Sequence, residues 1–360
     1  MIETPALLGY RMPAEWEPHE ATWVAWPHNR DDWPGKFAPI PWVYAEIVRH
    51  LSRVERVNVL VHGGEKRQER VAEILEKAGA DLGRVTLLRA RTDRVWLRDS
   101  GPTFLVRDTA PSDRLALLHW KFNAWAKYDN YHSDKLVPKL VARQLQAKRW
   151  VPRVELEGEH RRVVLEGGAI DVNGAGTLIT TEECLLSDVQ ARNPWLDREG
   201  VERVAADFLG ARHVIWLGPG IAGDDTHGHV DDLARFVGPR TVVAVVEKQR
   251  SDPNFEPLQE NWKRLEAARD QDGNALELVP LPMPEPVLFE GERLPASYAN
   301  FYIANGLVLV PTFNDPADRE ALNTLASVFP DRTVVGIHCV DLVLGLGTLH
   351  CLTQQQPATP

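Results

Sequence analysis

The residues best suited to chemistry lie in loops that recur at a regular interval. From Asp99 to Glu166 is 67 positions, from Glu166 to Asp231 is 65, and from Asp231 to Tyr298 is 67. Cys351 follows 53 positions later, at the end of a glycine-rich apolar segment. Scattered surface residues have no reason to keep such an interval. The spacing therefore indicates equivalent positions in a repeated structural unit that converge on one axis.

A thiol, an imidazole and three carboxylates would suit a planar cation if the loops met in one pocket. Carboxylates pair with a guanidinium through two parallel hydrogen bonds, so Asp99, Glu166 and Asp231 favour such a ligand. Cys351 could then attack the carbon of that ligand. By itself, a lone cysteine in such a segment is usually a small core residue, and His350 beside it is expected to be a packing or hydrogen-bonding neighbour.

The elements that must position these loops repeat along the chain. Alternating apolar residues, turn signals at Asn173-Gly174 and Asn305-Gly306, and segments with helical spacing predict the order strand, strand, helix, strand. This order occurs four times, over 101–157, 161–218, 229–282 and 297–340. In the first of these units the helix is expected at YHSDKLVPKLVARQLQ, despite Pro138, and the third strand at RVELE.

The beginning of the chain is less regular. A strand is expected at 20–26, a helix at 40–53 and another strand at 54–62. The segment around Cys351 could supply the missing strand, which predicts a ring closed across the two ends of the chain. Five units in 360 residues average 72 residues each, which suits propeller-like modules around an axis. The expected fold is α/β, in one domain that spans 1–360.

Composition excludes several classes of protein. The three cysteines (Cys184, Cys339 and Cys351) are an odd number without a CxxC pair, so neither a disulfide framework nor a zinc ribbon is expected. The first residues do not resemble a secretion signal, and no apolar stretch approaches the length of a membrane span. A cytoplasmic location and no membrane partner are therefore expected. The net charge of −10 disfavours nucleic acid and favours small cations. Homo-oligomerisation is left open.

Eight stretches, spread over nearly the whole chain, carry a family resemblance. They are MPAEWEPHEATWVAWP, WLRDSGPTF, FNAW, VLEGGAI, TTEECLL, GHVDDLARF, SYANFYIANG and LHCLTQQQP. With these stretches the sequence resembles the agmatine deiminase family, also called the Porphyromonas-type peptidylarginine deiminase family, of the guanidine-modifying or pentein superfamily. The resemblance implies a pentein fold, a five-bladed α/β propeller of pseudo-fivefold strand-strand-helix-strand modules around a central site.

The resemblance also implies a role for each matching residue. Asp99 and Asp231 would clamp the guanidinium from two sides, His229 would be the acid and base, and Glu166 would orient it. Cys351 would attack the guanidinium carbon, release ammonia and leave a covalent thiouronium, which water then hydrolyses. No metal or organic cofactor is implied.

The implied substrate is a small cationic guanidine, with agmatine leading. Agmatine would give N-carbamoylputrescine, a step of putrescine and polyamine metabolism. Its second cation would suit the extra acidic residues Asp224, Asp225 and Asp232. Trp96, three residues before Asp99, is the tryptophan expected to form a wall of the pocket through a cation–π contact. Where many relatives read GGGNIHC and TDGHVDN, this chain reads GLGTLHC and THGHVDD. Peptidylarginine, free arginine or another small guanidine therefore stay open.

Two other classes of function are also open. The sequence His227-Gly228-His229 followed by Asp231-Asp232 resembles part of a metallohydrolase site, because histidine and aspartate are ordinary zinc ligands. That interpretation leaves the other loops unexplained. A noncatalytic pentein that only binds a guanidinium is the second alternative.

Overall fold

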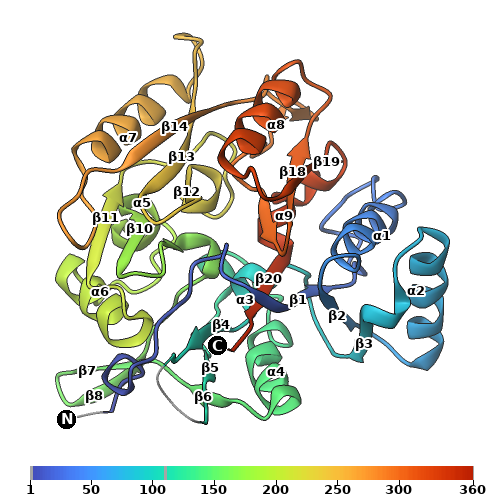
Figure 1. The fold of residues 1–360 in the computed structure, drawn as a ribbon, viewed down its shortest axis with the longest axis horizontal. Helices are drawn as coiled ribbons and strands as arrows, with labels where there is room; N and C mark the ends of the chain where they lie inside the picture. Colours follow the sequence, from blue (N-terminus) through green and yellow to red (C-terminus); the bar gives the residue numbers. More distant parts are fainter. Residues whose placement is uncertain (1–2, 109–111, 360) are drawn as a thin grey trace.

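Five small sheets surround a common axis in a computed structural model, which describes residues 3–108 and 112–359 (Figure 1). In each sheet an antiparallel pair of strands is followed by a parallel strand. The parallel strand requires a crossover connection, and a helix supplies it in each unit. These helices lie toward the rim in Figure 1, whereas α3 (Leu97–Ser100) and α9 (Leu349–Leu352) lie near the centre.

The first two units contain the following elements. Unit one has β20 (Thr353–Pro357), β1 (His19–Ala25), α1 (Ile40–Leu51), β2 (Arg56–Val61), α2 (Glu65–Lys77) and β3 (Val85–Arg89). Unit two has β4 (Thr103–Val106), β5 (Leu115–Leu118), α4 (Val137–Leu145) and β6 (Lys148–Trp150).

The other three units share one simple plan. Unit three has β9 (Asp171–Val172), β10 (Thr177–Thr181), α5 (Glu182–Leu186), α6 (Arg198–Val204) and β11 (His213–Leu217). Unit four has β12 (Ala234–Phe236), β13 (Thr241–Val246), α7 (Phe255–Ala267) and β14 (Glu277–Pro282). Unit five has β17 (Tyr302–Ala304), β18 (Leu307–Thr312), α8 (Ala317–Val328) and β19 (Thr333–His338).

The central strand of a unit is apolar and buried. β13 reads TVVAVV, and its four middle residues are buried. The first five residues of β18, LVLVP, are likewise buried. Strands covered on both faces read as continuous apolar runs, which is why the sequence predicted these two strands.

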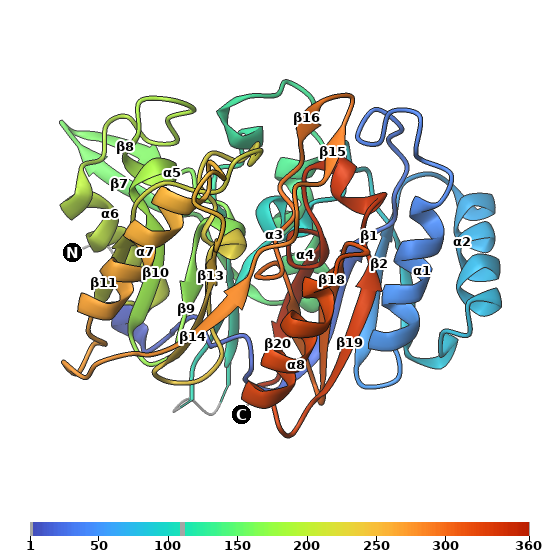
Figure 2. The same cartoon turned by 90° about the horizontal axis from the view of Figure 1, so that it is seen from above.

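The view from above shows how the helices are spread across the molecule. α2 and α6 lie at opposite edges of this view, with α3 near the middle (Figure 2).

The ring is closed by the two ends of the chain, as the sequence predicted. β20 pairs antiparallel with β1, with Thr22 opposite Gln355. The indole Nε1 of Trp23 donates to Gln356 Oε1 at 2.9 Å across this pair. His19 N also donates a hydrogen bond to Asn305 Oδ1 at 2.9 Å, which joins the first unit to the fifth. β20 follows α9 directly, and closure therefore brings Cys351 to the centre.

Several predicted boundaries were wrong. RVELE is not the third strand of unit two. Arg153–Leu156 forms β7, which pairs with β8 (Glu159–Arg162) in a separate hairpin, while β6 is the third strand. The helix expected from residue 131 begins at Val137, because Pro138 suits a first turn and not an interior. α2 and β3 were not predicted, and residues 109–111 of the expected unit-two hairpin lie outside the described residues.

No helix within the described ranges has the length and apolarity that crossing a bilayer requires. A further small hairpin, β15 (Leu288–Phe289) and β16 (Glu292–Arg293), precedes unit five.

Candidate active site

Cys351 lies on α9, a helix of four residues that depends on a neighbour for its position. The Oδ1 atom of Asn300 accepts hydrogen bonds from Thr348 Oγ1 at 2.9 Å, from His350 N at 3.0 Å and from Cys351 N at 3.3 Å. These donors include amides of the first helical turn, which have no partner inside the helix. Asn300 therefore fixes the backbone that carries the thiol.

The Cys351 thiol is buried and faces acidic groups. Its Sγ lies 3.1 Å from Asn300 Nδ2 and 3.7 Å from Asp231 Oδ2. Burial raises the pKa of the thiol well above its ordinary value, and the charges of Asp231, Asp232 and Asp99 raise this pKa further, against the hydrogen bond from Asn300. These surroundings favour the protonated thiol over the thiolate.

His229 and Asp231 share a tight turn. The turn is a 3₁₀ helix, Val230–Asp232. The backbone that leads into it is fixed by Asp224, whose Oδ2 accepts hydrogen bonds from Gly228 N at 2.7 Å and from His229 N at 3.2 Å. His229 and Asp231 are both fully buried.

The ring of His229 lies between two carboxylates. Its Nδ1 is 3.8 Å from Asp99 Oδ2 and its Nε2 is 3.9 Å from Glu166 Oε2. In the described part of the chain neither ring nitrogen has a hydrogen-bond partner. Burial alone would lower the pKa of His229, but Asp99, Cys184 and Glu166 raise it well above the ordinary value. A charged imidazole with uncommitted nitrogens is suited to donate a proton.

Asp99 is held by one backbone and one side-chain donor. It lies on α3, where Gly168 N donates to its Oδ1 at 2.9 Å and Trp125 Nε1 donates to its Oδ2 at 2.8 Å. Burial raises the pKa of Asp99, His229 opposes that rise, and Asp231 adds to it.

Glu166 is ionised because an arginine faces it. Arg192 Nε lies 3.1 Å and 3.3 Å from its two carboxylate oxygens, and both side chains are fully buried. Burial would raise the pKa of Glu166, but Arg192 and His229 lower it to about 2. Arg192 also donates from Nη2 to Thr226 O at 2.5 Å, which ties Glu166 to the loop before His229.

A small cavity is lined by two of these residues, Asp99 and Cys351, together with Trp96, Trp125 and Asp225. Trp96, predicted as a wall of the substrate pocket, lines this cavity, and its role in binding stays a prediction. Trp96 is 4% exposed, and its ring centroid is 5.7 Å from that of Trp33.

The structure brings together all five residues that the sequence nominated for catalysis. Tyr298, the reference residue of the fourth loop, does not join them, because its hydroxyl donates to Asp318 Oδ1 at 2.7 Å. Asn300, two positions later, contacts the thiol instead. Arg192 and Asn300 were both missed. The regular interval pointed close to Asn300, whereas nothing in the sequence around Arg192 distinguishes it.

The two histidines of the alternative metal site have different surroundings. His227 Nε2 lies 3.2 Å from Ser187 Oγ and its Nδ1 3.4 Å from Glu183, whereas His229 faces Asp99 and Glu166. Within the described ranges, the residues close enough to share a metal ion are Glu166, Cys184 and His229, whose candidate ligand atoms lie within 4.8 Å of one another. That group contains neither His227 nor Asp231.

Comparison with known proteins explains why these loops converge. Residues 11–357 match the family model described as Porphyromonas-type peptidyl-arginine deiminase. The chain belongs to this family. Among curated members, an agmatine deiminase from Stutzerimonas stutzeri is 37% identical over 99% of this chain and 98% of its own.

Solved structures agree with this family assignment. An agmatine deiminase of Enterococcus faecalis superposes with a TM-score of 0.87 at 32% identity, over 99% of this chain and 98% of its own. An amidinotransferase from Microseira wollei, at 12% identity, shares the fold with a TM-score of 0.51, over 96% of each chain. The predicted pentein architecture is confirmed.

Proposed function

We propose that this protein is an agmatine deiminase, which hydrolyses the guanidinium of agmatine to N-carbamoylputrescine and ammonia. The observation that carries the proposal is the cavity lined by Cys351 and Asp99, because it brings together a thiol, a carboxylate and aromatic walls. Full-length similarity to agmatine deiminases supports the same activity. No step of the proposed reaction requires a metal or a cofactor.

The first half of the reaction forms a covalent intermediate. The guanidinium binds between Asp99 and Asp231, and its charge lowers the pKa of the Cys351 thiol, which releases its proton to solvent. The thiolate attacks the guanidinium carbon to give a neutral tetrahedral adduct. His229 then donates a proton to one amino group, ammonia leaves, and a thiouronium cation stays attached to sulfur.

The second half hydrolyses this intermediate. His229, now neutral, accepts a proton from water as the oxygen attacks the same carbon. The adduct collapses to the carbonyl, the carbon–sulfur bond breaks, and the thiolate is restored. The remaining hydroxyl proton leaves, and ammonia takes it up as ammonium. Glu166, held ionised by Arg192, keeps His229 oriented and cationic between turnovers.

Asp225 is the acidic residue that we assign to the far amine of agmatine. Asp224 is committed to backbone amides and Asp232 to Asn300, whereas Asp225 lines the cavity. Lys127 Nζ and Tyr128 OH contact its two oxygens, the latter at 2.7 Å. An incoming ammonium would replace Lys127 there. This preference for a second cation separates agmatine from a peptidylarginine.

The test measures ammonia release and ureido product with agmatine, free arginine and a blocked peptidylarginine. Turnover of agmatine that resists EDTA and disappears in Cys351→Ala is the expected result. Cys339→Ala is the matched control, because this thiol is buried in the core away from the cavity. Turnover that survives Cys351→Ala but is lost in EDTA would assign the reaction to a metal. Binding without turnover in the wild type would assign a noncatalytic role.

A further inference from the structure

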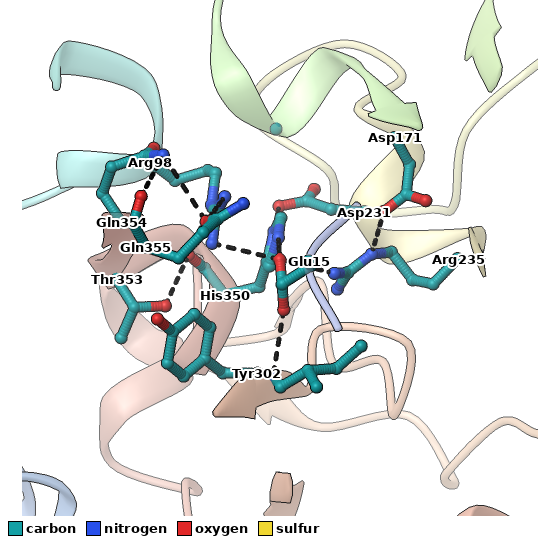
Figure 3. Close-up of polar contacts among 12 residues, drawn as sticks. Glu15, Arg98, Asp171, Asp231, Arg235, Tyr302, His350, Thr353, Gln354 and Gln355 are labelled. Atoms are coloured by element: carbon teal, nitrogen blue, oxygen red, sulfur yellow. Dashed lines mark hydrogen bonds and ion pairs between the residues drawn. The ribbon is translucent and has the colours of Figure 1, made fainter. Parts of the chain in front are cut away.

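A buried cluster of charged side chains surrounds His350, the neighbour of Cys351 in the sequence (Figure 3). It consists of three carboxylates, two guanidinium groups and one imidazole, from residues far apart in the sequence. The members are Glu15, Asp171, Asp231, Arg98, Arg235 and His350, and each is at most 7% exposed. Charged groups are rarely buried unless they are paired, so each charge in the cluster is expected to have a partner.

His350 joins two carboxylates of this cluster through both nitrogens of its ring. Its Nδ1 lies 2.7 Å from Asp231 Oδ2, and its Nε2 lies 2.8 Å from Glu15 Oε2. An ionised carboxylate only accepts hydrogen bonds, whereas a neutral imidazole has a single N–H to donate. Both contacts are satisfied at once when both ring nitrogens carry a proton, which makes the ring a cation.

The charge balance of the cluster supports the same protonation state. Arg235 contacts Glu15 Oε2 at 2.9 Å and Asp171 Oδ2 at 2.5 Å, and Arg98 contacts Glu15 Oε2 at 3.4 Å. Two arginines leave one of the three carboxylate charges uncompensated. A cationic His350 supplies the missing charge, and an uncompensated buried charge is costly.

This arrangement determines which oxygen of Asp231 can bind a substrate. Oδ2 is occupied by His350, whereas Oδ1 is buried and has no hydrogen-bond partner in the described part of the chain. Burial would raise the pKa of Asp231, but the hydrogen bond and charge of His350 lower it, with help from His229 and Arg235. The clamp carboxylate is thus kept ionised, with one oxygen free.

We propose that His350 is a positioning residue which, as an imidazolium held by Glu15, orients Asp231 and keeps it ionised for a guanidinium. The proposal rests on the proposed deiminase function and deepens it. His350 acts through Asp231 and does not touch the reacting atoms. Glu15, more than 330 positions away in sequence, anchors the other nitrogen.

Other charges also face Asp231, and they determine the expected pH dependence. His229 and Arg235 favour its ionised form, whereas Asp232, Asp99 and a thiolate at Cys351 oppose it. Removing the His350 cation therefore raises the pKa of Asp231. At neutral pH a fraction of the variant would carry a protonated clamp, which binds a guanidinium poorly.

The kinetic test compares wild type and His350→Gln across a range of pH. The expected result is a KM for agmatine that rises about tenfold at neutral pH, with a smaller fall in kcat, because a charge-assisted contact to the ligand is weakened. The acid limb of kcat/KM shifts upward by about one pH unit, and kcat/KM recovers as the pH rises toward about 9. Glu15→Gln shifts the limb in the same direction by less. The exposed His338→Gln is the matched control.

A purely structural role predicts a different result. It would lower kcat/KM by the same factor at every pH, and this outcome would overturn the proposal, as would an unchanged acid limb in a folded His350→Gln. Absence of agmatine turnover in the wild type would instead overturn the proposed function.

A second measurement needs neither a variant nor activity. Neutron diffraction from crystals of the perdeuterated wild-type protein at about pH 7, near the ordinary titration range of histidine, shows the ring protons directly. Deuterium on both nitrogens of His350 is expected. Deuterium on one nitrogen alone would overturn the proposal, even if His350→Gln fails to fold.

Discussion

At the residue scale, the thiol of Cys351 lies among carboxylates. Asp231 Oδ2 is 3.7 Å from its Sγ, and the amide of Asn300 donates to the thiol at 3.1 Å as well as to Asp232. Its pKa is accordingly raised well above the ordinary value. In the proposed mechanism, ionisation of this thiol therefore depends on the charge that the substrate brings.

Alkylation of Cys351 by iodoacetamide tests this dependence. The rate is expected to rise with pH and to show no plateau below 9, the ordinary pKa value, because only the thiolate reacts. Subtracting the rate of Cys351→Ser removes any contribution of Cys184 and Cys339. A plateau near neutral pH would indicate a thiolate already formed in the free protein.

Trp125 is the second residue with a specific consequence, because its indole donates to Asp99, the proposed clamp residue. It lies among three successive residues with positive φ: Ala124 at 50°, Trp125 at 58° and Ala126 at 55°. Left-handed backbone costs roughly 1 kcal/mol per residue without glycine. The contact with Asp99 and the aromatic packing on Phe122 and Tyr128 oppose that strain.

Trp125→Phe keeps an aromatic ring but removes the N–H that orients Asp99. The KM for agmatine is expected to rise about fivefold to tenfold, with little change in kcat, because one neutral donor to a carboxylate is lost. Steady-state kinetics measure both quantities. Trp42→Phe is the control, since Trp42 is half exposed on α1. An unchanged KM would mean that Gly168 alone fixes Asp99.

At the element scale, the residues of the proposed site lie in or beside short turns and not on the long helices. The 3₁₀ turn Gly167–Ala169 follows Glu166 and passes beside His229. A Cβ on Gly168 would lie 2.5 Å from His229 Nδ1 and 3.0 Å from both Asp231 Oδ2 and Asp99 Oδ1. The absence of a side chain there lets the three groups converge.

Gly168→Ala is expected to lower kcat/KM by about a hundredfold or more, since shifts of about 1 Å in catalytic groups have effects of that size. Far-UV circular dichroism and the urea midpoint show whether the fold is kept. Gly64→Ala is the control, because a Cβ there meets no atom within 4 Å and its φ is not positive. Equal activity in both variants would contradict the close packing around His229.

The sequence predicted elements better than the contacts between them. The turn at Asn305-Gly306 and the run in β13 have local signals, so units four and five were predicted correctly. RVELE alternates like any hairpin strand, which is why it was assigned to the wrong sheet. Arg192 and Glu15 contribute through partners at distant positions in the chain. Such contacts produce no local or periodic pattern in the sequence, so they could not be predicted from it. The regular interval indicated that the loops of Asp99, Glu166 and Asp231 would converge, and the resemblance to a known family added the role of each residue.

At the scale of the whole molecule, buried neutral histidines make stability depend on pH. His119 Nε2 donates to Lys135 O, at 2.8 Å, and its Nδ1 accepts from Arg149 Nη1 at 2.6 Å. The pKa of His119 is lowered to about 4, mainly by burial and also by the charges of Arg162 and Arg149. The hydrogen bond to Lys135 opposes this shift. Below its ordinary value of 6.5 the unfolded chain binds a proton more readily than the folded one.

The free energy of unfolding is therefore expected to fall as the pH drops from 6.5 toward 4, the window set by the shifted pKa of His119. Urea unfolding at several pH values in this window measures the slope. His119→Gln should flatten it, whereas His160→Gln, at an exposed position, should not. A slope equal to that of wild type in His119→Gln would assign the acid sensitivity to other groups.

The pairing of β20 with β1 has a consequence for synthesis on the ribosome. Glu15 is translated early, whereas His350 and Cys351 are translated more than 330 residues later, and the buried charged cluster needs both Glu15 and His350. Four of the five units can form their sheets before β20 emerges, but the thiol joins the carboxylates only when the ring closes. A nascent or truncated chain would therefore lack the proposed reactive centre, and deiminase activity would appear only after the ring has closed.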